Sequence, residues 1–188
     1  FPAPFSGLLV GNGAAAGEAV LSTSPERFLQ VEPGGAVQTR PIKGTRPRHA
    51  DPRIDDDLAA ELVCSAKDRA ENVMIVDLLR NDLGRVCKPG SVQVPDLVRL
   101  ESYARVHHLT SVVTGQLLPE ATWVDLLEAS WPGGSITGAP KLRACQRLNE
   151  LETQGRGPYC GSLLHLDWNG RFDSNILIRT LLRKDSQL

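Results

Sequence analysis

The chain has 188 residues, the length of about one domain, with 41% hydrophobic and 23% charged residues, as in a soluble globular protein. Its formal net charge of -1 argues against bulk attraction to nucleic acid or to anionic membranes, so a small anionic ligand would need local cations. No apolar run reaches the roughly 18 residues that a membrane-spanning helix requires, so no membrane span is predicted.

The N-terminal part of the chain is predicted to form β-strands. Segments 7–10 and 19–22 flank a loop rich in glycine and alanine, which predicts a hairpin. Further strands are expected at 28–31 and 37–40. The Pro- and Arg-rich stretch 46–53 is predicted to be a surface loop.

The clearest helical segment runs from Asp55 to Leu83. Its apolar residues recur with the period of 3.6 that places them on one face of a helix. Acidic residues at its start suit the positive end of the helix dipole, and Gly84 suits a C-terminal stop. A helix is therefore predicted over the whole segment.

Strands and short helices are predicted for the remainder. Residues 92–118 are rich in β-branched side chains, and Thr122 with Asp125 resembles a capping box that opens a helix to about residue 130. A second helix is expected from Pro140 to about residue 151, and Asn169-Gly170 predicts a two-residue hairpin turn. Strands in blocks with helices between the blocks predict an antiparallel α+β fold.

The cysteines and the chain ends add two expectations. No two cysteines have CxxC spacing, so no zinc site is predicted. Their single placement inside apolar stretches is typical of reduced core thiols in a cytoplasmic protein. The chain starts at Phe1 without methionine and stops soon after an apolar run. We therefore expect residues 1–188 to be part of a catalytic domain that is truncated at both ends.

Lys43 is a candidate nucleophile. It lies in Pro41-Ile42-Lys43-Gly44-Thr45, between a proline and a glycine that constrain the backbone. A lysine held in this way can act as a nucleophile or general base, whereas a solvated loop lysine is the alternative that the pattern alone leaves open.

Asp68 and Glu71 are candidate metal ligands. They are three residues apart and share one helix face, where two carboxylates can hold Mg²⁺ directly or through its waters. A solvated charged face is the alternative. His108, within a predicted strand, is either a structural histidine or a general acid or base.

A glycine-rich loop precedes the helix predicted at Pro140. Its backbone amides could bind an anion, but the loop lacks the order of residues found in a phosphate-binding P-loop. A plain connection is the alternative.

Tyr159 and Arg179 are predicted on the two strands of the last hairpin, where arginine could grip a carboxylate. If Trp168 lay opposite Arg171, a regular hairpin would point Tyr159 and Arg179 to opposite sides. A bulge near Gly161 would be needed for them to cooperate.

Taken together, these segments resemble the chorismate-binding family, which includes anthranilate, aminodeoxychorismate, isochorismate and salicylate synthases. The resemblance runs from Pro2 to about Leu182. The motifs that carry it are SPERF (24–28), PIKGT (41–45), AENVMIVDLLRNDLGR (70–85), HLTS (108–111), GSITGAPK (134–141) and IRT (178–180).

Within this family, lysine in the PIKGT motif is typical of the aminodeoxychorismate synthases, and anthranilate synthases carry a small residue there. The resemblance implies that Lys43 attacks the chorismate ring as the 4-hydroxyl leaves, and that ammonia then displaces it at C4. Ammonia would come from a glutamine amidotransferase subunit or domain, or from free ammonia. The alternatives are anthranilate synthase component I and an inactive fragment of the family.

The resemblance also implies roles for the other candidates. Glu71 would bind Mg²⁺ directly with Asp68 as an outer partner, and His108 would assist departure of the hydroxyl. Thr45 would line the pocket. Ser135 would lie at the ring carboxylate, while the enolpyruvyl carboxylate would be held by Tyr159 and Arg179. The implied fold is a pair of packed antiparallel sheets with outer helices. It continues beyond Arg179 into a glycine-rich segment and a helix with a second metal-binding glutamate.

Overall fold

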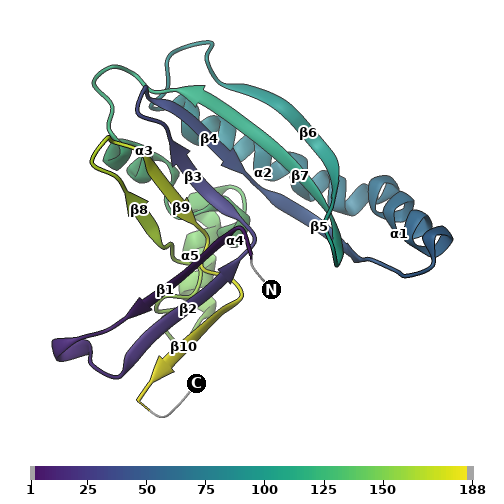
Figure 1. Ribbon diagram of the computed structural model, residues 1–188. Coiled ribbons are helices and arrows are strands. Elements are labelled where there is room, and N and C mark those ends of the chain that lie inside the picture. Colours follow the sequence, from purple (N-terminus) through teal and green to yellow (C-terminus); the bar gives the residue numbers. More distant parts are fainter. Residues whose placement is uncertain (1–2, 186–188) are drawn as a thin grey trace.

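Two antiparallel sheets organise the computed structural model, which describes residues 3–185 (Figure 1). The smaller sheet has three strands, β1 (Phe5–Val10), β2 (Glu18–Ser24) and β10 (Thr180–Lys184), and η1 (Gly13–Ala15) lies in the β1–β2 loop. The larger sheet has seven strands, namely β3 (Arg27–Val31), β4 (Ala36–Arg40), β5 (Ile42–Pro47), β6 (Gln93–Ser102), β7 (Val106–Gln116), β8 (Leu164–Leu166) and β9 (Phe172–Asn175).

Strand β7 is the centre of the larger sheet. One of its edges pairs with β4 and β5 in succession, with Pro41 between them, and the other edge pairs with β6 (Figure 1). Proline lacks a backbone N–H, so it suits the junction between two strands. The PIKGT motif is thereby held against β7, next to His108.

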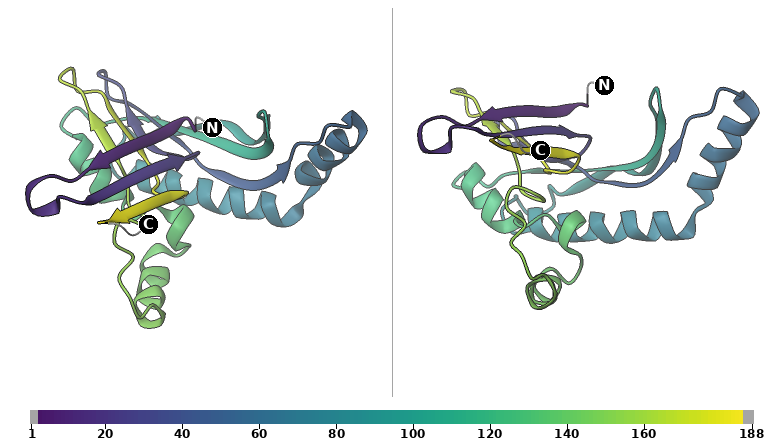
Figure 2. Two further views of the ribbon diagram at one scale, coloured as in Figure 1. Left: turned by 60° about the horizontal axis from the view of Figure 1, so that its bottom comes forward. Right: turned by 90° about the horizontal axis from the view of Figure 1, so that it is seen from below.

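The helices are α1 (Pro52–Cys64), α2 (Ala66–Gly84), α3 (Trp123–Ser130), α4 (Gly134–Thr137) and α5 (Lys141–Leu151). In Figure 2 (right), α2 and α5 lie on one side of the larger sheet and the smaller sheet lies on the other side. The predicted antiparallel α+β fold is confirmed, as is the capping box of Thr122 and Asp125 at the start of α3.

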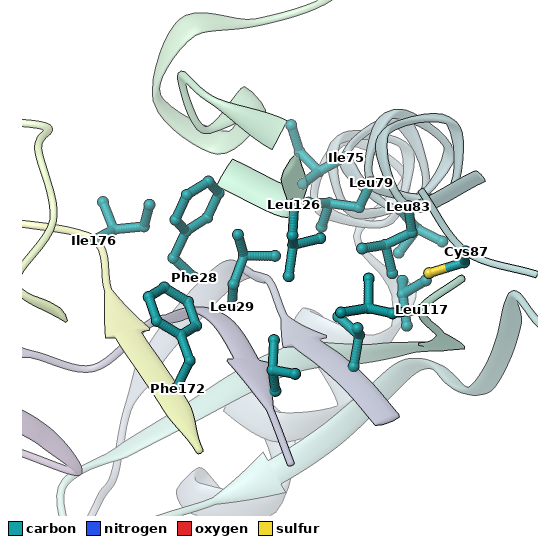
Figure 3. Packing of buried hydrophobic residues seen from close by; sticks show 14 residues of the cluster. Phe28, Leu29, Ile75, Leu79, Leu83, Cys87, Leu117, Leu126, Phe172 and Ile176 are labelled. Carbon is teal, nitrogen blue, oxygen red and sulfur yellow. The ribbon is translucent and has the colours of Figure 1, made fainter. Parts of the chain in front are cut away.

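The main core lies between α2, α3 and the middle strands of the larger sheet (Figure 3). Apolar side chains from β3, β7 and β9 meet one face of α2, as alternation in strands and the helical period require. The cluster consists of Phe28, Leu29, Val31, Val37, Ile75, Val76, Leu79, Leu83, Cys87, Val113, Leu117, Leu126, Phe172 and Ile176.

The prediction of one helix over 55–83 was wrong at Ser65, where α1 ends and α2 begins. The Ser65 N–H donates to the carbonyl of Leu62, and its hydroxyl accepts from the N–H of Asp68. Serine side chains compete for backbone hydrogen bonds in this way, and apolar periodicity does not reveal it. The break lets α1 turn away from α2 (Figure 2).

The predicted two-residue turn at Asn169-Gly170 was also wrong by one position. Leu166 pairs with Phe172, and the Asp167 N–H donates to the carbonyl of Arg171, so the turn is longer. Gly170 takes a φ of 85°, which residues other than glycine rarely adopt. The extra residue shifts the register of the whole hairpin.

Two smaller expectations need correction. Residues 46–47 belong to β5 rather than to a surface loop, because Arg46 and Pro47 pair with His107 and Val106 of β7. All four cysteines are free thiols, but Cys64 is exposed and only Cys87 and Cys160 are buried. The expectation of core positions therefore holds for two cysteines.

Candidate active site

Lys43 extends from β5 toward the glycine-rich loop. Its Nζ donates a hydrogen bond of 2.9 Å to the carbonyl oxygen of Ser135 in α4. The following residue, Gly44, has a φ of 89°, and β5 shifts register between Ile42 and Thr45. A bulge of this kind redirects side chains locally, and it brings the motif toward the loop.

Gly44 also permits a close approach between β5 and the helices. A Cβ atom at this position would lie 2.9 Å from both the Asp68 Cβ and a Leu62 methyl group. Glycine is therefore required by space as well as by backbone conformation. Asp68, one of the predicted metal ligands, consequently lies directly against the PIKGT motif.

Glu26 is a buried carboxyl group beside Lys43, and the sequence analysis gave it no role. Burial raises its pKa, while the charge of Lys43 and contacts with Ser135 and the Ile42 backbone act in the opposite direction. A glutamate just before the apolar strand 28–31 was the available signal, since carboxylates seldom enter a core without a partner. Lys43, Glu26 and Ser135 thus form one polar cluster.

His108 and Thr45 form the neighbouring part of the site. Nδ1 of His108 lies 2.8 Å from the Thr45 hydroxyl, and its ring contacts Tyr103 at a centroid distance of 5.9 Å. Burial lowers the pKa of His108. A contact with the Gly44 backbone opposes this shift, and the positive charge of Arg179 adds to it. The neutral imidazole is therefore the favoured form.

The two predicted metal ligands form long ion pairs with neighbouring basic side chains. Asp68 Oδ2 lies 3.4 Å from a guanidinium nitrogen of Arg46, and Glu71 Oε1 lies 3.9 Å from Nζ of Lys67. Both carboxylates have the hard oxygen donors that Mg²⁺ prefers. Within residues 3–185, however, no three acidic, histidine or cysteine side chains come together in a geometry for a metal ion.

Tyr159 and Arg179 lie outside regular strands. Both are exposed, and a positive φ at Cys160, before β8, and at Arg179, after β9, interrupts the two predicted hairpin strands. The Cys160 N–H donates to the Leu177 carbonyl, and the Leu177 N–H donates to the Gly161 carbonyl, so two residues lie opposite one, a bulge at the position predicted near Gly161. Residues 157–160 form a turn, so the hairpin register does not extend to Tyr159 and Arg179, and no hydrogen bond joins these two residues in the described part of the chain.

The geometry therefore brings Lys43, Thr45, His108, Ser135 and Asp68 to one region, with the charge of Arg179 acting on His108. A family model described as chorismate binding enzyme matches residues 1–188. The chain belongs to the chorismate-binding enzyme family.

Other members of the family are similar over nearly the whole chain. Aminodeoxychorismate synthase component 1 of Salmonella typhimurium is 52% identical over 99% of this chain, and its Escherichia coli counterpart is 51% identical over 99%. The solved structure of anthranilate synthase component I from Streptococcus pneumoniae covers 96% of the chain with a TM-score of 0.83 and 40% identity.

The chain spans only part of these chorismate-binding relatives. It covers 40% of the length of the two bacterial aminodeoxychorismate synthase components and 38% of the anthranilate synthase chain. No helix among the described residues has both the length and the apolar character needed to cross a membrane.

Proposed function

We propose that the full-length protein carrying this chain converts chorismate and ammonia into 4-amino-4-deoxychorismate. The observation that carries the proposal is Lys43, which lies in the PIKGT motif and contacts the Ser135 carbonyl beside the buried Glu26. The similarity to two proteins named aminodeoxychorismate synthase component 1 supports the same substrate and product.

In the first step, the neutral amine of Lys43 forms a bond to a ring carbon as the bond between C4 and its hydroxyl breaks. The hydroxyl leaves as water with a proton from solvent that His108, held by Thr45, relays to it. The carboxylate of Glu26 accepts the proton that Lys43 loses on forming the bond. A covalent step of this kind divides one difficult substitution into two easier ones.

In the second step, ammonia forms the bond to C4 and releases one proton to solvent. The bond to Lys43 breaks with its electron pair returning to Nζ, which takes back the proton from Glu26. The overall change replaces the hydroxyl with an amino group and releases water. Ammonia would come from a glutamine amidotransferase partner, a role consistent with relatives that are named as component 1. Arg179 and Tyr159 would hold the enolpyruvyl carboxylate, and Ser135 the ring carboxylate.

Two carboxylates on α2 would contribute to a magnesium site. Mg²⁺ would supply positive charge for the ring carboxylate of the substrate. Glu71 would bind the ion, and Asp68, which is paired with Arg46, would accept hydrogen bonds from its waters. The remaining ligands would be water, substrate or residues outside this chain.

Replacing Lys43 tests the proposal directly. In the full-length protein supplied with chorismate and ammonia, Lys43→Ala should lower the formation of aminodeoxychorismate by at least about 100-fold, because the covalent route is lost. Lys88→Ala, which removes an exposed lysine that follows α2, is the matched control and should leave the rate unchanged. A wild-type rate in Lys43→Ala would remove Lys43 from the mechanism.

The second candidate function is that of anthranilate synthase. It is favoured by the 40% identity to the solved anthranilate synthase component I, and the same assay separates the two functions. Product analysis that found anthranilate in place of aminodeoxychorismate would support the second candidate, whereas Lys43 favours the first.

A further inference from the structure

Lys141 makes a buried connection between three helices. Its Nζ donates hydrogen bonds of 2.7 Å to Asp82 Oδ2, near the end of α2, and of 2.7 Å to the carbonyl of Ser130, at the end of α3. Lys141 itself begins α5. The Asp82 side chain is 3% exposed and that of Lys141 is 16% exposed, so the pair is almost free of solvent.

The two ends of the glycine-rich loop are joined by this one ammonium group. Ser130 precedes the loop and Lys141 follows it, so the bond to the Ser130 carbonyl closes residues 131–140 at their base. The bond to Asp82 fastens that base to α2. A substrate-binding loop held at both ends loses less conformational freedom when it orders around a ligand.

The same loop is also pressed against α2 at its centre. A Cβ atom on Gly134 would lie 2.1 Å from a methyl carbon of Leu78, so α4 packs closely against α2 at this glycine. The next residue, Ser135, presents the carbonyl that accepts the hydrogen bond from Lys43. The position of Lys43 is therefore set by a loop whose base Lys141 holds.

We infer that Lys141 is a positioning residue for Lys43, acting through Asp82, the Ser130 carbonyl and the Ser135 carbonyl. The inference deepens the proposed function and rests on it for the catalytic readout. Burying an ion pair between helices costs desolvation energy, and apolar residues of similar size are often as stabilising. An ammonium group, however, fixes two oxygen atoms at once, and an apolar side chain fixes neither.

The test uses a double variant, because Lys141→Met alone would leave the buried Asp82 charge without its ammonium partner and would strongly destabilise the protein. In Asp82→Asn/Lys141→Met both charges are removed and the loop base is released. Ser130→Ala is the matched control. It deletes a buried hydroxyl that has no hydrogen-bond partner among residues 3–185 but keeps the carbonyl that Lys141 binds.

Two readouts are measured on the full-length protein. The first is kcat for aminodeoxychorismate formation, which should fall at least about tenfold in the double variant. The second is the rate at which an amine-directed acylating reagent labels Lys43, measured by peptide mass spectrometry, which should rise at least about threefold. Labelling of the core thiol Cys87, 3% exposed, by a separate thiol-directed alkylating reagent reports general loosening and should stay at the wild-type rate.

The outcomes separate the two hypotheses. Unchanged kcat and Lys43 labelling in the double variant would overturn the inference. Increased labelling of both Lys43 and Cys87 would also overturn it, because Lys141 would then only hold the fold together. If the wild-type protein makes no aminodeoxychorismate but Lys43 labelling still rises alone, the proposed function fails and the positioning role stands.

Discussion

At the scale of single residues, the site depends on a carboxyl group that the sequence did not assign. Glu26 is 6% exposed and lies beside Lys43. Its pKa in the folded state is above the ordinary value of 4.5, chiefly because burial disfavours the charged form. Between that value and its folded pKa, the folded state binds more protons than the unfolded state.

The shifted pKa of Glu26 predicts a pH effect on stability. Because the folded pKa is raised, the stabilisation is fully present below about pH 4.5 and is lost as pH rises through the folded pKa. Glu26→Gln cannot titrate, so its free energy of unfolding should fall less between pH 4.5 and 7 than that of the wild type. Urea unfolding at several pH values measures this, with the exposed Glu18→Gln as control. Parallel curves for Glu26→Gln and wild type would contradict the assignment.

The metal hypothesis makes a prediction for Glu71. An amide lacks the charge that Mg²⁺ requires, so Glu71→Gln in the full-length protein should weaken Mg²⁺ binding at least about tenfold. Titration of activity against Mg²⁺ measures the change. Asp77→Asn, on an exposed residue of the same helix, is the control. An unchanged Mg²⁺ requirement would exclude Glu71 as a ligand.

The sequence indicated much of the candidate site because the family motifs carry it. Lys43 contacts Ser135, and Thr45 contacts His108, while the catalytic roles of these residues stay predictions. The distances between these residues could not be predicted, because the distances depend on the bulge at Gly44 and on how closely α4 packs against α2. Glu26 was missed because burial, rather than a local pattern, brings it next to Lys43.

At the scale of elements, the sequence predicted helix ends and strands correctly where the interactions that form them lie within a few neighbouring residues. Thr122 with Asp125 fixed the start of α3, because both hydrogen bonds lie within one turn. The break at Ser65 was missed, since the apolar period continues through it. The shifted turn at Gly170 was missed because Asn-Gly serves more than one type of hairpin loop.

Gly44 offers the sharpest test at this scale. Gly44→Ala should lower the free energy of unfolding by about 1–3 kcal/mol, because alanine resists a positive φ and its Cβ would meet Asp68 and Leu62. Gly84→Ala, at the end of α2, is the control. It has open space and no positive φ, and should be neutral or stabilising by up to about 1 kcal/mol. Urea unfolding of both variants measures the difference, and equal stability of Gly44→Ala and wild type would contradict the packing argument.

At the scale of the whole molecule, the antiparallel α+β class followed from blocks of strands separated by helices. The pairing of β10 with β2 did not, since it joins segments from opposite ends of the chain. Local patterns carry no information about such pairing, and the last apolar segment was predicted as part of the neighbouring hairpin. This pairing creates a separate sheet with exposed apolar residues, among them Leu8, Leu9, Val10, Leu181 and Leu182.

These exposed residues predict how the chain behaves when residues 1–188 are expressed alone. Leu8, 64% exposed, and Leu181, 56% exposed, share one face of the smaller sheet, and Leu9, 59% exposed, is on its opposite face. Exposed apolar surface of this kind promotes association. Unpaired edge strands add to that tendency. We therefore expect concentration-dependent self-association in analytical ultracentrifugation. Leu9→Lys/Leu181→Lys should reduce it, and Leu142→Lys, an exposed position on α5, is the control.

The same piece should bind chorismate weakly or not at all. Its candidate metal site contributes the carboxylates of Glu71 and Asp68, and the second of these is already paired with Arg46. Mg²⁺ gives up water reluctantly and prefers a near-octahedral oxygen shell, so this pair forms a poor site by itself. Calorimetric titration with chorismate and Mg²⁺, using the dispersed Leu9→Lys/Leu181→Lys variant, measures the affinity. Mg²⁺-dependent binding near 1 μM, about 8 kcal/mol, would show that the binding site is complete within these residues.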